Sequence, residues 1–213
     1  MELRPYQKEA KEAIFEQWDS GVSKTLLVLP TGCGKTVVFA KVTEECVRQG
    51  DRVLILAHRG ELLEQAADKL MKTTGLGCAL EKAESSCQGS WFRVVVGSVQ
   101  TLMREKRLNS FDPFYFNTII IDEAHSGQSG RNAANMNLAL SGLASDSELD
   151  NEDKINAMVE GRKLVKTASY FAFTATPKNK TEEVFGTPYE EDGQIKHRPF
   201  HVYTMKQAIQ EGF

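Results

Sequence analysis

Short apolar runs alternate with longer segments in which apolar residues recur at helical spacing. The runs are bounded by turn residues and charges, which is typical of buried strands. The predicted strands are residues 25–29, 53–57, 92–98, 118–121 and 169–177. Helices are predicted between them, from Pro5 to just before Gly21, at 37–47 and at 62–71, where apolar residues recur about every four positions.

This alternation predicts an α/β domain with a mostly parallel sheet and helices on both faces. Strands that are apolar throughout, such as Val53–Ala57, fit a sheet that is buried on both sides. Residues 181–193 are rich in turn formers, with Gly186, Pro188 and Gly193. A short strand at 201–203 and a short helix at 205–210 are expected to follow.

Composition narrows the class without identifying a function. The chain has 213 residues, is 41% hydrophobic and 26% charged, and carries a net charge of -3, so any nucleic-acid site must be a local patch. No apolar run approaches the length of a membrane span, and the N-terminal residues lack the apolar core of a signal peptide. The four cysteines show no C-x-x-C pairing, so we expect reduced thiols in a cytoplasmic protein.

The run LPTGCGKT carries the first chemical signal. It lies between a predicted strand and a predicted helix, the order that a phosphate-binding loop needs. Gly32 and Gly34 would let the backbone amides turn around a polyphosphate, Lys35 would reach the β- and γ-phosphates, and Thr36 would offer its hydroxyl to Mg²⁺. Leu29 stands where the full pattern has its first glycine. The ordinary alternative is a glycine turn that happens to precede a lysine.

An acidic pair, Asp122 and Glu123, ends the strand at 118–121. Two adjacent carboxylates at the mouth of a parallel sheet are costly without a cation, and nucleotide-bound Mg²⁺ is such a cation. Asp122 would hold the metal, and Glu123 would orient and deprotonate the attacking water. His125 could couple this site to the next motif. The alternative is a strand that ends in solvated acids.

Other candidate residues are weaker when taken alone. The Gln7 amide could pair with an adenine edge, although its spacing alone favours a solvated helix residue. Arg59 follows a predicted strand, where a phosphate contact or an ordinary surface charge would both fit. Thr174 and Thr176 could relay between a metal site and nucleic acid, or simply cap a turn.

Three segments occur in this order: the phosphate loop, the run DEAH at 122–125 and the run TAT at 174–176. Together they resemble the first RecA-like domain of superfamily 2 helicases and translocases, a P-loop NTPase fold. The resemblance also covers LRPYQ as an adenine-reading motif, and AHRGELLEQ and GSVQTL as motifs that contact nucleic acid. It implies an ATP site formed by Arg4, Gln7, Pro30, Thr31, Gly32, Cys33, Gly34, Lys35 and Thr36. It implies Lys35, Asp122 and Glu123 as catalytic residues, and Thr36 and Asp122 as the Mg²⁺ site. It implies His125, Thr174 and Thr176 in coupling, and Arg59, Gln100 and Thr101 as DNA contacts.

The second half of the chain resembles more narrowly the motor of the R subunit of type I restriction enzymes, as in KHRPFHVYTMKQAIQEGF. That resemblance implies ATP-driven translocation on double-stranded DNA, with methylase and specificity subunits as possible partners. The alternatives are a bacterial or phage helicase of repair or replication, or a nucleotide-dependent DNA-binding module without turnover. Residues 1–197 are expected to form the ATP-binding domain. Residues 198–213 are expected to begin an interdomain segment, with the chain ending before a second RecA-like domain and therefore hydrolysing ATP slowly by itself.

Overall fold

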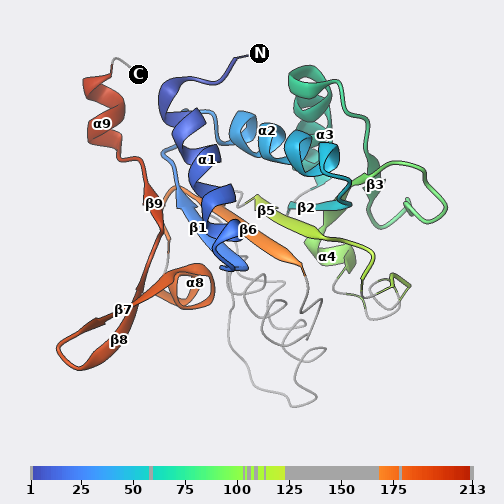
Figure 1. Cartoon of the computed structure of the whole chain (residues 1–213). Helices are drawn as coiled ribbons and strands as arrows, with labels where there is room; N and C mark the ends of the chain where they lie inside the picture. Colours follow the sequence, from blue (N-terminus) through green and yellow to red (C-terminus); the bar gives the residue numbers. More distant parts are fainter. Residues whose placement is uncertain are drawn as a thin grey trace.

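The computed structural model describes residues 2–57, 60–102, 104, 107, 110–112, 114–122, 168–177 and 179–211. Arg59, Glu123 and His125 lie outside these residues, so the predictions for them rest on sequence. The described residues form an α/β domain around one seven-stranded sheet and a separate two-stranded hairpin (Figure 1).

The large sheet is parallel at every pairing. Its order is β3-β4-β2-β5-β6-β1-β9. The strands are β1 (Lys24–Val28), β2 (Val53–Ala57), β3 (Ala79–Glu81), β4 (Val94–Ser98), β5 (Thr118–Asp122), β6 (Ser169–Thr174) and β9 (His201–Val202). The sequence-based prediction of an α/β fold with a mostly parallel sheet is therefore confirmed.

Helices cover both faces of the sheet, because successive strand residues point to opposite sides. One face packs against α1 (Pro5–Asp19), α2 (Lys35–Arg48) and α3 (Gly60–Thr74), with Ile55 and Phe171 in that layer (Figure 1). The other face packs against α4 (Val99–Leu102) and α8 (Asn179–Phe185), with Leu54 and Ile121 in that layer. The last helix, α9 (Met205–Gln210), buries its Ala208 in the same layer as α1.

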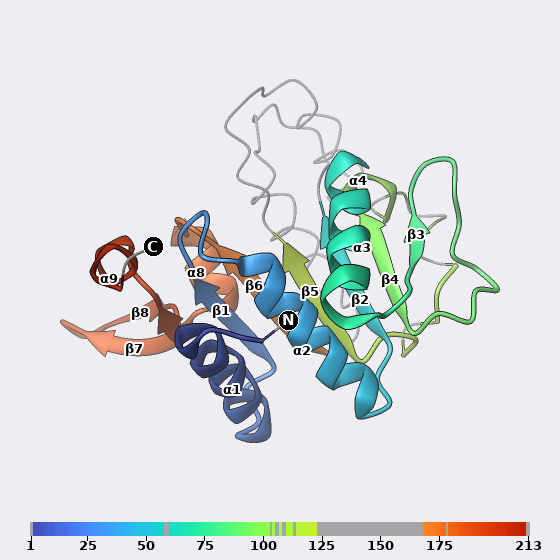
Figure 2. The same cartoon turned by 90° about the horizontal axis from the view of Figure 1, so that it is seen from above.

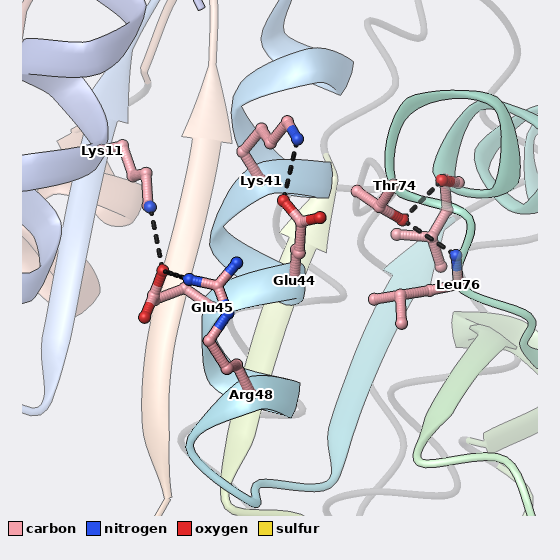
Figure 3. A network of polar contacts seen from close by, with 8 residues as sticks. Lys11, Lys41, Glu44, Glu45, Arg48, Thr74 and Leu76 are labelled. Atoms are coloured by element: carbon pink, nitrogen blue, oxygen red, sulfur yellow. Dashed lines mark hydrogen bonds and ion pairs between the residues drawn. The ribbon is translucent and has the colours of Figure 1, made fainter. Parts of the chain in front are cut away.

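Polar contacts link and end the helices on the first face (Figure 3). Lys11 Nζ of α1 lies 3.2 Å from Glu45 Oε2 of α2, and the Arg48 guanidinium contacts the same oxygen at 2.9 Å. At the end of α3, the Thr74 hydroxyl accepts a hydrogen bond from the Leu76 N–H at 3.1 Å. These contacts are partly solvated, so each adds little to stability beside the apolar packing.

Residues 181–193, which are turn-rich in sequence, form regular elements that the sequence did not predict. Helix α8 ends at Phe185, and the chain then forms an antiparallel hairpin from β7 (Thr187–Glu191) and β8 (Gln194–Arg198), which projects from the large sheet (Figures 1 and 2). Asp192 and Gly193 both have positive φ, of 54° and 73°, which is the backbone of a tight hairpin turn. The strands are largely exposed, so they lack the apolar alternation that would have predicted them. None of the helices among the described residues is both long and apolar enough to cross a membrane.

Candidate nucleotide-binding site

Sheet order brings three of the predicted segments to one edge of the sheet. Strand β6 lies between β1 and β5, with Val28 in register with Thr174 and Phe173 in register with Asp122. The phosphate loop follows β1, so Thr174 lies between that loop and Asp122. Figure 2 shows β1, β6 and β5 beneath α2. The carboxyl ends of parallel strands are where ligands bind in open α/β sheets.

The phosphate loop has the backbone that its glycines predict. Gly32 has φ of 89° and Gly34 has φ of 73°, and α2 begins immediately afterwards at Lys35. The first amides of a helix have no partner within it, so α2 presents N–H groups at the end of this loop. A β-carbon at Gly34 would lie 2.5 Å from Gln7 Nε2, so this position also has no room for a side chain unless Gln7 moves.

Tyr6 and Gln7, at the start of α1, donate hydrogen bonds to the backbone of the phosphate loop. The Tyr6 hydroxyl donates to the Cys33 carbonyl at 2.9 Å, and Gln7 Nε2 donates to the same oxygen at 3.1 Å. Gln7 Oε1 accepts from the Arg4 N–H at 3.0 Å, and only 5% of Gln7 is exposed. The structure therefore places Gln7 against the phosphate loop, and its role in reading adenine stays a prediction.

Sequence reasoning missed the contact of Tyr6 with the loop. Tyr6 lies in the LRPYQ run, in which the sequence predicts site roles only for Arg4 and Gln7. The only available signal was its position beside Gln7 at the start of a helix, because the 27-residue separation from Cys33 cannot be read from local pattern.

Asp122 and Lys35 influence each other across the site. Burial raises the pKa of the Asp122 carboxyl above its ordinary value, and the positive charge of Lys35 partly opposes that increase. A half-buried carboxylate at the end of β5 is therefore costly in its charged form. This donor set fits a magnesium nucleotide, because a cation for the phosphates, helix amides and a carboxylate for the metal meet here. Thr36, the other predicted metal ligand, is half-buried in the first turn of α2.

Thr174 and Thr176 form a turn that lies between the phosphate loop and Asp122. The Thr174 hydroxyl is buried and accepts from the Thr176 N–H at 3.2 Å. The Thr174 carbonyl accepts from the Leu29 N–H at 3.0 Å, which ties β6 to the start of the phosphate loop. The turn thus touches the loop directly and adjoins the strand of Asp122. Its coupling role stays a prediction.

The predicted DNA contacts differ in their exposure. Gln100 of α4 is exposed, whereas Thr101 beside it is only 4% exposed, so its side chain is turned inward. A β-carbon at Gly97 would lie 2.6 Å from Leu102 Cδ1, so this glycine lets α4 fold closely onto β4. The GSVQTL run therefore has a packing reason for its glycine, and a DNA contact from it would come through Gln100.

An ion pair with a buried carboxylate lies beside the GSVQTL run, because Glu81 is in register with Gly97. Glu81 of β3 is fully buried and accepts from the Arg107 guanidinium at 2.6 Å and from the Cys87 N–H at 2.7 Å. In the sequence, Arg104, Lys106 and Arg107 form a small basic cluster, which is usually a solvated face; that it borders a nucleic-acid track stays a prediction. The Arg107 guanidinium is engaged with Glu81, whereas Arg104 of the same cluster is exposed.

Comparison with known proteins agrees with this arrangement. The family model described as "Type III restriction enzyme, res subunit" matches residues 1–179. The chain is 39% identical over 131 residues to the putative ATP-dependent helicase IRC3 of Saccharomyces cerevisiae, which covers 58% of this chain and 19% of that protein. It is 26% identical over 216 residues to the type I restriction enzyme EcoAI endonuclease subunit of Escherichia coli, covering 99% of this chain and 23% of the relative.

A solved structure shares the fold over almost the whole chain. The ATP-dependent type ISP restriction-modification enzyme LlaBIII bound to DNA superposes with a TM-score of 0.62 at 21% identity, covering 99% of this chain and 16% of that one. The chain spans about a fifth of the length of the curated relatives described above. With most of its length matched by one family model, this chain belongs to the res-subunit family of helicase-type motor domains, as the resemblance of its motifs had predicted.

Proposed function

We propose that this chain is the ATP-binding domain of an ATP-dependent DNA translocase, and that the translocase is the motor of a restriction enzyme of the type I class. The observation that carries the proposal is the meeting of the phosphate loop, Thr174 and Asp122 at the carboxyl ends of adjacent strands. A site with that order can bind a magnesium nucleotide and pass a change at its phosphates to the neighbouring turn.

Each residue would contribute one interaction. Lys35 and the first amides of α2 would bind the phosphates, and Thr36 and Asp122 would hold Mg²⁺, in part through water. Glu123, which directly follows Asp122 in sequence, would orient and deprotonate the attacking water. Thr174 and Thr176, with His125, would couple hydrolysis to movement on DNA.

The restriction assignment is supported by the extent of the matches. The EcoAI subunit aligns with 99% of this chain, whereas IRC3 aligns with 58% of it. On this proposal the substrate is double-stranded DNA, contacted at its backbone by Arg59 and Gln100. Methylase and specificity subunits would be the partners, and residues 1–197 the ATP-binding unit. The protein would work in the cytoplasm, in agreement with four cysteines that are free thiols.

Phosphate release from the full-length protein tests the proposal. Duplex DNA should stimulate release. Glu123→Gln should leave ATP affinity nearly unchanged while lowering turnover roughly a hundredfold or more, the scale of general-base loss. Asp122→Asn is the matched comparison, because its defect should shrink as Mg²⁺ concentration rises. Turnover that ignores duplex DNA, or that survives Glu123→Gln, would contradict the proposal.

A further inference from the structure

The end of the described chain returns to the phosphate loop. After β8 the chain enters the large sheet as β9, beside β1, and the Tyr203 N–H donates to the Val28 carbonyl at 2.9 Å. This places the Tyr203 ring on the Tyr6 ring, with centroids 4.2 Å apart and planes 7° from parallel. Both residues are only 4% exposed, so the stack is part of the packed interior.

The stack completes a continuous path from the phosphate loop to α9. On one side, the Tyr6 hydroxyl donates to the Cys33 carbonyl between the two loop glycines. On the other side, the Tyr203 hydroxyl donates to Glu211 Oε2 at 2.8 Å, just beyond the end of α9. The Thr204 side chain caps the start of α9 by accepting from the Gln207 N–H at 3.2 Å. A shift of the Cys33 peptide would therefore move Tyr6 through its hydrogen bond and then Tyr203 through the stacked rings.

The electrostatics of the loop agree with this proximity. Burial raises the pKa of the Cys33 thiol, the charges of Arg4 and Lys35 oppose that increase, and the Glu211 carboxylate adds to it. Burial and the neighbouring Glu211 likewise raise the pKa of the Tyr203 hydroxyl, so it stays protonated as the donor of its hydrogen bond. The end of α9 thus lies within electrostatic reach of the phosphate loop.

We propose that Tyr203 is a positioning residue for the nucleotide: through its stack on Tyr6 it couples the phosphate loop to residues 203–211, so that nucleotide binding orders this segment and the segment in turn supports binding. The inference rests on the proposed nucleotide site. Coupling of two binding-linked elements is reciprocal, so both directions can be measured. The degree of order of residues 203–211 would then depend on whether nucleotide is bound.

Hydrogen exchange of the wild-type chain, with and without ATP·Mg²⁺, tests the coupling without any substitution. Amides of the phosphate loop and of residues 203–211 should both exchange more slowly with nucleotide. In Tyr203→Leu, which keeps apolar volume but removes the ring, the loop should still be protected and residues 203–211 should not. ATP affinity should fall about two- to tenfold, the range that a lost aromatic pair supports.

Two further variants distinguish loss of the aromatic stack from general destabilisation of the protein. Tyr203→Phe keeps the ring and removes the bond to Glu211, so ATP affinity should stay within about twofold of wild type. Tyr189→Leu is the matched control, because Tyr189 lies in β7 beneath the Arg198 guanidinium, 5.2 Å from the ring centroid, and belongs to the separate hairpin. It should leave affinity and the protection of residues 203–211 unchanged.

The outcomes distinguish the inference from the proposed function. Wild-type protection of the phosphate loop without protection of residues 203–211 would overturn the coupling and leave the nucleotide site intact. Equal ATP affinity for wild type and Tyr203→Leu would overturn it as well. Absence of protection anywhere, at saturating ATP·Mg²⁺, would instead contradict the proposed nucleotide site itself.

Discussion

Gly34 is the position in the phosphate loop where one added methyl group would meet another part of the proposed site. Its φ is 73°, and a β-carbon there would lie 2.5 Å from Gln7 Nε2. Gly32 offers a matched comparison two residues earlier. Its φ is 89°, but a β-carbon would have nothing within 4 Å. Gly32→Ala therefore measures backbone strain, and Gly34→Ala measures strain together with displacement of the Gln7 amide.

The two effects can be estimated separately. Left-handed backbone costs an alanine about 1–2 kcal/mol, which applies at both positions. Displacing Gln7 would break its hydrogen bonds to the Cys33 carbonyl and the Arg4 N–H. The Cys33 carbonyl keeps its hydrogen bond from Tyr6, but leaving the buried Gln7 amide unpaired costs a further 1–3 kcal/mol, roughly. Gly34→Ala should therefore lower the free energy of unfolding by about 2–5 kcal/mol, against about 1–2 kcal/mol for Gly32→Ala.

Urea denaturation followed by circular dichroism measures both variants. For a chain of this size each kcal/mol corresponds to about 2–4 °C in melting temperature, so thermal scans give a second readout. In a Gln7→Ala background, Gly34→Ala should cost no more than Gly32→Ala, because the clash is gone. Equal losses for Gly32→Ala and Gly34→Ala in the wild-type background would refute the reasoning that Gln7 packs against the loop.

Three further predictions concern charged residues. Because burial raises the pKa of Asp122 against the opposing charge of Lys35, Mg²⁺-dependent ATP affinity should increase as pH rises through that raised pKa. Asp122→Asn should flatten this increase in calorimetric titrations at several pH values, and an unchanged pH profile would count against the metal role. Arg107→Ala should lower the free energy of unfolding by up to about 3 kcal/mol, because it leaves Glu81 buried without its ion pair. Arg104→Ala should leave stability nearly unchanged and reduce the salt dependence of DNA binding by about one unit of slope, whereas equal salt slopes for wild type and Arg104→Ala would contradict a phosphate contact.

Apolar runs were enough to predict the strands that build the site. The run Val53–Ala57 matches β2 residue for residue, and Met205–Gln210 matches α9. These elements are predictable because they depend on local sequence: a strand buried on both faces is apolar throughout, and a helix has apolar residues at helical spacing. The position of Asp122 near the phosphate loop followed from the same logic, since both segments end parallel strands.

Features that depend on long-range pairing or on exposed strands could not be predicted in this way. The hairpin of β7 and β8 has solvent on most of its residues, so the Asp192-Gly193 turn was its only local signal. The stack of Tyr203 on Tyr6 joins residues at opposite ends of the chain. Thr101 illustrates a third limit, because the GSVQTL motif places it just after β4 without saying how far its side chain is buried; its contact with DNA stays a prediction.

Isothermal titration of the chain with ATP in the presence of Mg²⁺ tests the central claim most directly. We expect saturable binding by the wild type and a loss of more than about tenfold in affinity for Lys35→Ala, because Lys35 supplies charge-assisted contacts to the phosphates. The heat signal should also require Mg²⁺, through Asp122 and Thr36. Equal affinity for wild type and Lys35→Ala, or no binding by the wild type, would contradict the account.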